Sequence, residues 1–269
     1  MQDMLGFEPE GAMRIAGVLL VVLCAGCSPA AASPEGDAPL ANTEIQITSH
    51  VSSVRTWRAL LVAGDRGEHV FDHAVRKLAE LLGKYGVADI AVLSAKAAID
   101  VASLDNMRQS LANTDADAGC FVFVTSHGLR EGLLLRGPKQ EILTPRLLDA
   151  MLDDSCGDVP TIVIASGCYS GVFVGPVMLA QNRIILTAAH KRRTSFGCTN
   201  DRDLTFYDSC LLRSLDGATL WAKIARDTER CVRRLETRHD FTPSQPQEFF
   251  GTAVRDLSVF GRAEEEPAN

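Results

Sequence analysis

Two short segments of the sequence carry side chains suited to nucleophilic chemistry. An apolar run over residues 120–125 leads into Ser126-His127-Gly128, and a second run over residues 161–165 leads into Ser166-Gly167-Cys168. A thiol of ordinary pKa is mostly protonated at neutral pH. A neighbouring imidazole can take that proton and later donate it to a leaving amine. We therefore predict Cys168 as a nucleophile and His127 as its general base.

Glycine adjoins both of these residues, which would let a peptide backbone come close. We expect the backbone N–H groups of Gly128 and Cys168 to stabilise an oxyanion, and one such donor is worth about 3 kcal/mol in the transition state. A serine hydrolase of the G-x-S-x-G kind is excluded, because Cys168 stands where the first glycine before Ser170 would be. Gly64-Asp65-Arg66-Gly67 does not supply a dinucleotide-binding motif.

A cysteine or a His-Gly pair alone is more often structural than catalytic, so the elements around them must bring the two together. Continuous apolar runs predict strands, and apolar residues at helical spacing predict helices. Thr144-Pro145 is a typical helix start, and Gly86 a typical helix stop. The predicted strands are 57–63, 89–93, 120–125, 161–165 and 183–188, with a hairpin over 133–135 and 141–143; the predicted helices are 75–85, 103–112, one from 145 and 219–236.

Strands that are apolar throughout and alternate with helices favour an α/β fold. We expect a mostly parallel central sheet covered by helices on both faces, in one domain over residues 51–262. Ligands of such sheets bind beyond the carboxyl ends of the strands. His127 and Cys168 each follow a strand directly, so both are predicted to lie at this edge.

The N-terminal region resembles a bacterial lipoprotein signal. Met13 and Arg14 precede an apolar run of about eleven residues, which is too short to span a membrane. The run ends on Ala25-Gly26-Cys27, where a lipoprotein signal is cut and the cysteine is acylated. We expect residues 1–26 to be a signal peptide that starts at Met13, and Cys27 to be lipidated. Residues 27–50 would then be a flexible tether and 263–269 a disordered tail.

The overall composition limits the possible partners and the redox state. A net charge of -7 argues against nucleic-acid binding. Outside Cys24 and Cys27 of the predicted signal segment the sequence has no CxxC spacing, and it has no HExxH spacing. We expect neither a metal nor another cofactor. Six cysteines follow Cys27, and an exported compartment permits disulfides whose pairing sequence cannot give. If Cys168 is a free thiol, at least one other cysteine stays unpaired.

The strand-Ser-His-Gly and strand-Ser-Gly-Cys-Tyr-Ser-Gly motifs together resemble peptidase family C13, the legumains or asparaginyl endopeptidases, and most closely their bacterial branch. The resemblance extends through residues 186–198, Thr205-Phe206-Tyr207 and Ser244-Gln245-Pro246-Gln247. It implies a caspase-like three-layer fold and a dyad of His127 and Cys168. Gly128 would be an oxyanion donor, and the implied substrate-pocket residues are Ser166, Thr194, Ser195 and Asp208.

One position departs from the plant and animal members of that family. They carry an arginine where this chain has Asp72, just before His73. An acidic residue there could favour Arg or Lys before the cut, so a preference for Asn is not carried over. Alternatively, Asp72 caps the helix that follows. His73 is expected to be structural, and His69 to lie on the surface or a pocket wall.

We therefore predict a cysteine endopeptidase that acts on peptides or proteins through a thioester acyl-enzyme. It would be anchored by Cys27 in the bacterial cell envelope, at the outer membrane facing the periplasm. Two alternatives stay open: a catalytically silent, lipid-anchored scaffold of the same fold, and a transpeptidase that uses the same dyad. The sequence does not determine the oligomeric state.

Overall fold

The computed structural model describes residues 56–112, 117–199 and 201–261, all of which fall within the unit Ile47–Asn269. The predicted signal peptide, the predicted lipidation site Cys27, the predicted tether and the predicted tail lie outside the described residues. Within the described part, no helix has both the length and the apolar character that crossing a membrane requires.

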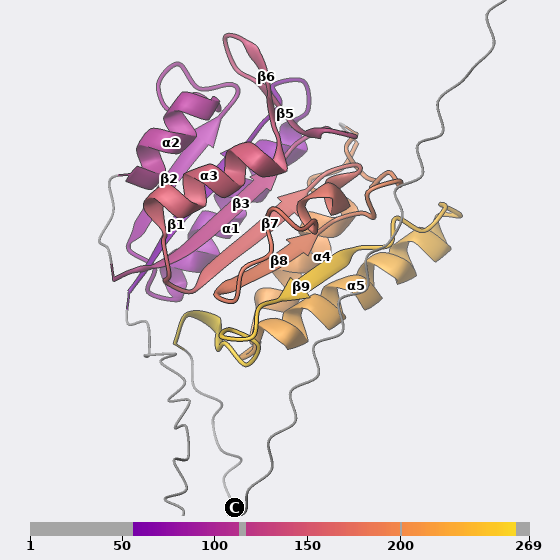
Figure 1. Cartoon of the computed structure of the whole chain (residues 1–269). Helices are drawn as coiled ribbons and strands as arrows, with labels where there is room; N and C mark the ends of the chain where they lie inside the picture. The colour runs from indigo at the N-terminus through magenta and orange to yellow at the C-terminus, as the bar shows by residue number, and fades with distance from the viewer. Residues whose placement is uncertain (1–55, 113–116, 200, 262–269) are drawn as a thin grey trace, which may run out of the picture. The chain divides into compact units, whose positions relative to one another are not determined.

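A six-stranded sheet forms the centre of the molecule (Figure 1). Five neighbouring strands are parallel, and the last pairs antiparallel with its neighbour. The mostly parallel sheet predicted from the apolar strands is thus confirmed. In sheet order the strands are β2 (Asp89–Ser94), β1 (Trp57–Ala63), β3 (Gly119–Thr125), β7 (Thr161–Ser166), β8 (Arg183–Thr187) and β9 (Gln247–Phe250).

Helices cover both faces of this sheet, as predicted. One face carries α1 (His69–Lys84), α4 (Phe206–Leu215) and α5 (Trp221–Arg238). The other carries α2 (Leu104–Ala112) and α3 (Pro145–Ser155), which lie in front of the sheet in Figure 1. These layers form a three-layer α/β sandwich.

Alternation along each strand supplies one apolar cluster to each face. In β3, Phe121 and Phe123 pack with the cluster under α1, α4 and α5, whereas Val122 and Val124 pack with the cluster under α2 and α3. Every residue of β3 is buried. This explains why the sequence of the strand is apolar throughout rather than alternating.

A second, antiparallel sheet stands at the carboxyl edge of the large one. It contains β4 (Gly128–Leu129), β5 (Gly132–Arg136) and β6 (Gln140–Leu143). The hairpin β5–β6 matches the predicted one. Short 3-10 helices, η1 (Ser170–Phe173) and η2 (Val259–Gly261), complete the described elements.

The helix signals in the sequence also hold. The Thr144 hydroxyl accepts a hydrogen bond from the Leu147 N–H at 3.3 Å, and Pro145 begins α3. Helix α1 ends at Lys84, and Gly86 follows with a left-handed φ of 83°. The sequence did not predict α4 or β9 as separate elements.

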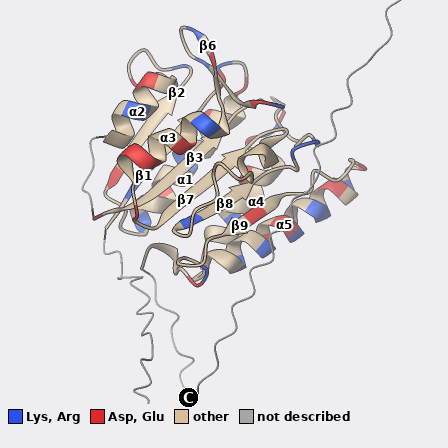
Figure 2. Cartoon of the chain, in the orientation of Figure 1, with Lys and Arg blue, Asp and Glu red and all other residues tan. Residues whose placement is uncertain are grey.

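Charged side chains of both signs occur along α5 (Figure 2). Asp227 pairs with Lys223 at 2.5 Å and with Arg230 at 3.3 Å, one turn away in each direction. Pairs of this kind stabilise an exposed helix by a few tenths of a kcal/mol each. They account for the strongly polar outer face of a helix whose inner face is buried.

Two disulfides join elements across the fold. One links Cys120 in β3 to Cys156 at the end of α3, and the other links Cys210 in α4 to Cys231 in α5. Among the described cysteines, Cys168 and Cys198 are free thiols. The structure therefore supplies the pairing that sequence left open, and Cys198 is the additional unpaired cysteine.

Candidate active site

The register between β3 and β7 decides where His127 and Cys168 lie. Thr125 and Ser166 are partners at the ends of these adjacent parallel strands. The Ser126 N–H continues the pairing by donating to the Ser166 carbonyl at 3.0 Å. His127 and Cys168 each follow two residues after this last pair, so they leave the same edge of the sheet at equivalent positions.

The backbones of the two loops are in close contact beyond that pair. A Cβ atom on Gly128 would stand 1.7 Å from the Cys168 carbonyl oxygen and 2.9 Å from its backbone nitrogen. Real Cβ atoms do not approach backbone atoms so closely, so a side chain at position 128 requires the loops to separate. Glycine at this position is what lets the His127 and Cys168 loops pack together.

The Cys168 sulfur lies against the segment that contains Ser195. The Ser195 N–H donates to Sγ at 3.4 Å, and the thiol in turn donates to the Ser195 carbonyl at 3.6 Å. The Ser195 hydroxyl is 3.8 Å from the same sulfur. The neighbouring Thr194 is exposed. The structure thus brings one predicted pocket residue, Ser195, into contact with Cys168, and Thr194 precedes it in the chain.

The turn that carries Cys168 is tight. Tyr169, the next residue, has a φ of 58°, in the left-handed region that non-glycine residues rarely adopt. Its N–H donates to the Arg193 carbonyl at 2.8 Å, which ties the turn to the segment before Thr194. The half-buried thiol is therefore held between β7 and residues 193–195.

His127 is held from two sides. Its carbonyl accepts a hydrogen bond from the Leu134 N–H in β5 at 2.9 Å. Its ring meets the ring of Phe71 in α1 edge to face, with the ring centroids 5.3 Å apart. Such edge-to-face packing fixes ring orientation as well as burying area. Sequence reasoning did not identify Phe71 as a neighbour of the predicted base.

Asp208 and Ser166 lie beneath the strand ends. The Asp208 side chain is fully buried, and its carboxylate accepts a hydrogen bond from the Thr125 hydroxyl at 2.8 Å. Burial raises the pKa of Asp208 above its ordinary value, while the hydroxyl groups of Ser166, Thr125 and Thr205 act to lower it. Both Asp208 and Ser166 were predicted to contact substrate, but they support the strand ends here and do not face solvent.

Asp72 lies in the first turn of α1, where Glu68 is the N-cap residue, so it is not the predicted cap. Its carboxylate accepts a hydrogen bond from the Ser94 hydroxyl at 2.5 Å and pairs with the Lys96 ammonium at 3.2 Å. These contacts join α1 to the end of β2. A preference for Arg or Lys before the cut would depend on the negative charge of Asp72, and that charge is already paired with Lys96.

Cys198 is a neighbour of the site that the sequence did not single out. Burial raises the pKa of its thiol, and so do the nearby Cys168 and Glu68. The two cysteines are thirty residues apart in sequence, a spacing that gave no local signal that one thiol would influence the pKa of the other. The protonated form of Cys198 is favoured, which suits an unreactive neighbour better than a second nucleophile.

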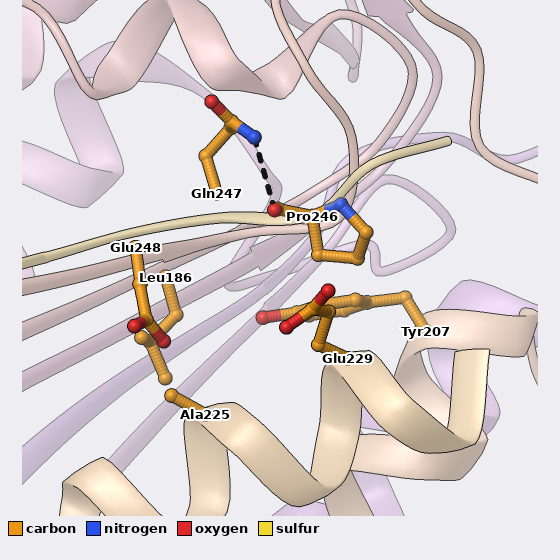
Figure 3. Close-up of a pocket in the computed structure, with 7 residues that line it drawn as sticks. All are labelled: Leu186, Tyr207, Ala225, Glu229, Pro246, Gln247 and Glu248. Atoms are coloured by element: carbon orange, nitrogen blue, oxygen red, sulfur yellow. Dashed lines mark hydrogen bonds between the residues drawn. The ribbon is translucent and has the colours of Figure 1, made fainter. Parts of the chain in front are cut away.

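A pocket of about 280 Å³ lies elsewhere, between the β8–β9 edge and helices α4 and α5 (Figure 3). Tyr207, Glu229 and Glu248 supply its polar lining, and the Tyr207 hydroxyl points toward the pocket interior. Partial burial and the nearby Glu229 raise the pKa of Glu248. Neither His127 nor Cys168 lines this pocket, so it is separate from the candidate active site.

Comparison with known structures agrees with this fold. Caspase-1 from Spodoptera frugiperda matches with a TM-score of 0.56 and 14% sequence identity, over 79% of this chain and 92% of the caspase. The likeness shows the fold, which is caspase-like as predicted. No curated protein matches the chain.

The model of the Peptidase C13 family matches residues 98–230, a span that includes both His127 and Cys168. Fold and motif together define a peptidase-type protein of the caspase-like class. The Peptidase C13 model thus covers the part of the chain that carries both motifs, and this is the family that the resemblance of the motifs predicted. The family match supports a cysteine-peptidase type of function on peptide or protein substrates. Helix α1, with Phe71 and Asp72, lies outside the matched span.

Proposed function

We propose that this protein is a cysteine endopeptidase in which Cys168 is the nucleophile and His127 the general base. The observation that carries the proposal is the Thr125–Ser166 pair, which places the two residues at equivalent positions on one sheet edge. The contact of Gly128 with the Cys168 backbone brings the two loops together beyond that pair. The family match over the same residues supports this assignment.

The proposed reaction has two halves. His127 takes the thiol proton of Cys168, and the sulfur attacks the peptide carbonyl carbon to form a tetrahedral intermediate. As the C–N bond breaks, the imidazolium gives its proton to the leaving amine, and a thioester remains. His127 then takes a proton from water, whose oxygen attacks the thioester; the acid product leaves and the thiol is restored.

The developing oxyanion would be held by backbone N–H groups. Those of Gly128 and Cys168 lie at the junction of the two loops, where a Cβ atom on Gly128 would stand 2.9 Å from the Cys168 backbone nitrogen. Thr194 and Ser195 would line the pocket for the residue before the cut, because Ser195 already contacts Sγ. Donors fixed in advance of the reaction are effective because they need little reorganisation.

We also propose that the protein acts in the bacterial cell envelope, held by a lipid on Cys27. The two disulfides support export, because disulfides persist in oxidising compartments and are rare in the cytosol. Labelling cells with a radioactive fatty acid, with Cys27→Ala as the matched variant, tests the anchor. A labelled Cys27→Ala protein, or an unlabelled wild type, would overturn this part of the proposal.

The activity is tested with the full chain in mild detergent and a fluorogenic peptide library varied at the residue before the cut. We expect turnover by the wild type and by Cys198→Ala, which removes the neighbouring free thiol, and none by Cys168→Ala. Turnover that persists in Cys168→Ala would refute the assigned nucleophile. Folded protein that neither cleaves peptides nor reacts with thiol-directed probes would favour the silent scaffold, and ligation to added amines would favour the transpeptidase.

A further inference from the structure

Two histidines and an aspartate form a cluster outside the proposed dyad. His69 and His73 lie one turn apart on α1, with ring centroids 4.8 Å apart. Asp203 reaches them from the segment that precedes α4, and its Oδ1 lies 3.7 Å from Nδ1 of His73. One possible ligand atom from each of the three residues lies within 4.8 Å of the other two.

The distances suit a shared ion better than a direct contact. The 3.7 Å between His73 and Asp203 is longer than a hydrogen bond. Metal–ligand distances of 2.0–2.1 Å in a tetrahedral zinc site put ligand atoms about 3.3 Å apart. Rotation of exposed side chains can supply the difference, because Asp203 is 78% exposed and His73 29%. The helix fixes the spacing of the two imidazoles.

The donor set selects the kind of ion. Imidazole nitrogen suits zinc and the late transition metals, whereas calcium and magnesium prefer oxygen ligands. Three protein ligands leave one tetrahedral position for water. Sequence motifs missed this set, because the third ligand is distant in the chain from the His-x-x-x-His pair.

We propose that His69, His73 and Asp203 bind a divalent zinc ion. The ion joins α1 to the segment that leads into α4, two parts of the chain that are far apart in sequence. Phe71, the residue that packs on His127, lies between the two histidines in α1, two residues from each. The proposed zinc site does not depend on the proposed function, because none of its three ligands belongs to the His127–Cys168 dyad.

Binding is measured on the full-length Cys168→Ala/Cys198→Ser protein, which lacks both thiols as competing ligands. Melting temperatures are recorded with EDTA and with Zn²⁺, and Co²⁺ spectra report the ligands directly. We expect one bound equivalent, and a rise of about 5–10 °C when free Zn²⁺ is about 100-fold above its dissociation constant. The Co²⁺ spectrum should show tetrahedral bands without thiolate charge transfer.

The ligand variants are His69→Ala, His73→Ala and Asp203→Ala, and His239→Ala is the matched control. We expect each ligand variant to weaken zinc binding at least tenfold and the control to leave it unchanged. The melting temperature of each variant in EDTA serves as its own reference, so a general loss of stability is measured separately from zinc binding. The Asp203 side chain is 78% exposed, so its removal should not unfold the chain. Undiminished binding by His73→Ala and Asp203→Ala, or no binding by the Cys168→Ala/Cys198→Ser parent, would overturn the site. Binding by the wild type that depends only on Cys168 would place the metal on the dyad instead.

Discussion

The Asp208 carboxylate and the Thr125 hydroxyl form a hydrogen bond of 2.8 Å, although 83 residues separate them in sequence. Thr125 ends β3 and is the register partner of Ser166, which ends β7. The contact connects α4 to the two strands that carry the proposed base and nucleophile. A buried acid therefore supports the edge on which the proposed chemistry depends.

Replacing Asp208 with Asn should change how stability depends on pH. Because burial raises the pKa of Asp208, its charged form is disfavoured in the folded state. That penalty is absent below the unfolded-state pKa, grows as pH rises from there, and is complete above the folded-state pKa. Asn keeps an acceptor for Thr125 and cannot ionise, so Asp208→Asn should gain stability relative to wild type as pH rises.

Urea unfolding of both proteins between acid and alkaline pH measures this difference. Asp208→Ala is the control, and it should be less stable than Asp208→Asn by about 1–3 kcal/mol because it leaves a buried hydroxyl unpaired. A stability difference between wild type and Asp208→Asn that stays constant with pH would contradict the prediction.

Gly128→Ala should abolish the proposed activity while the protein still folds. The added methyl would stand 1.7 Å from the Cys168 carbonyl oxygen, so the two loops must separate. Misplacement of reacting groups by about 1 Å can cost about 100-fold in rate, and we expect a loss of at least that size in kcat/KM. Gly83→Ala is the matched substitution, since no atom lies within 4 Å of its added Cβ.

We expect Gly83→Ala to keep full activity and to gain about 0.5–1 kcal/mol, the usual difference between Ala and Gly in a helix. Peptide cleavage and thermal melting of both variants provide the comparison. Near-wild-type cleavage by Gly128→Ala would show that the close packing of the loops is not required.

Removal of either disulfide should lower stability. In the chain-entropy model, the Cys120–Cys156 bond closes a loop of 36 residues and stabilises the fold by about 4 kcal/mol. The Cys210–Cys231 bond closes a loop of 21 residues and contributes about 3 kcal/mol. The pair Cys120→Ala/Cys156→Ala should thus cost slightly more than Cys210→Ala/Cys231→Ala. Urea unfolding gives the two costs, and peptide mapping without reductant identifies the pairs. A mapped bond to Cys168 or Cys198 would contradict the pairing.

Asp72→Ala should lower stability and leave the cleavage preference unchanged. Its carboxylate is paired with Ser94 and Lys96, so it acts as a link between α1 and β2. We expect a cost of about 1–2 kcal/mol, close to that of Ser94→Ala, which removes the other half of the same hydrogen bond. Loss of cleavage after Arg and Lys alone, with normal stability, would restore Asp72 as a specificity residue.

The sequence by itself determined the local elements and the two motifs. Burial of a strand on both faces demands an unbroken apolar run, which is why Trp57–Ala63 was predicted with its observed bounds. Thr144 and Gly86 mark helix ends through interactions with their immediate neighbours. Signals of this kind act within a few residues and can be read directly.

The tertiary structure decided which distant residues meet. Sheet order makes β3 and β7 neighbours, and only then do His127 and Cys168 share an edge. Three other features also depend on how whole faces pack against one another. They are the antiparallel pairing of β9, the burial of Asp208 and the approach of Asp203 to the α1 histidines. Contacts of long sequence separation result from burying these faces together, so no local pattern encodes them.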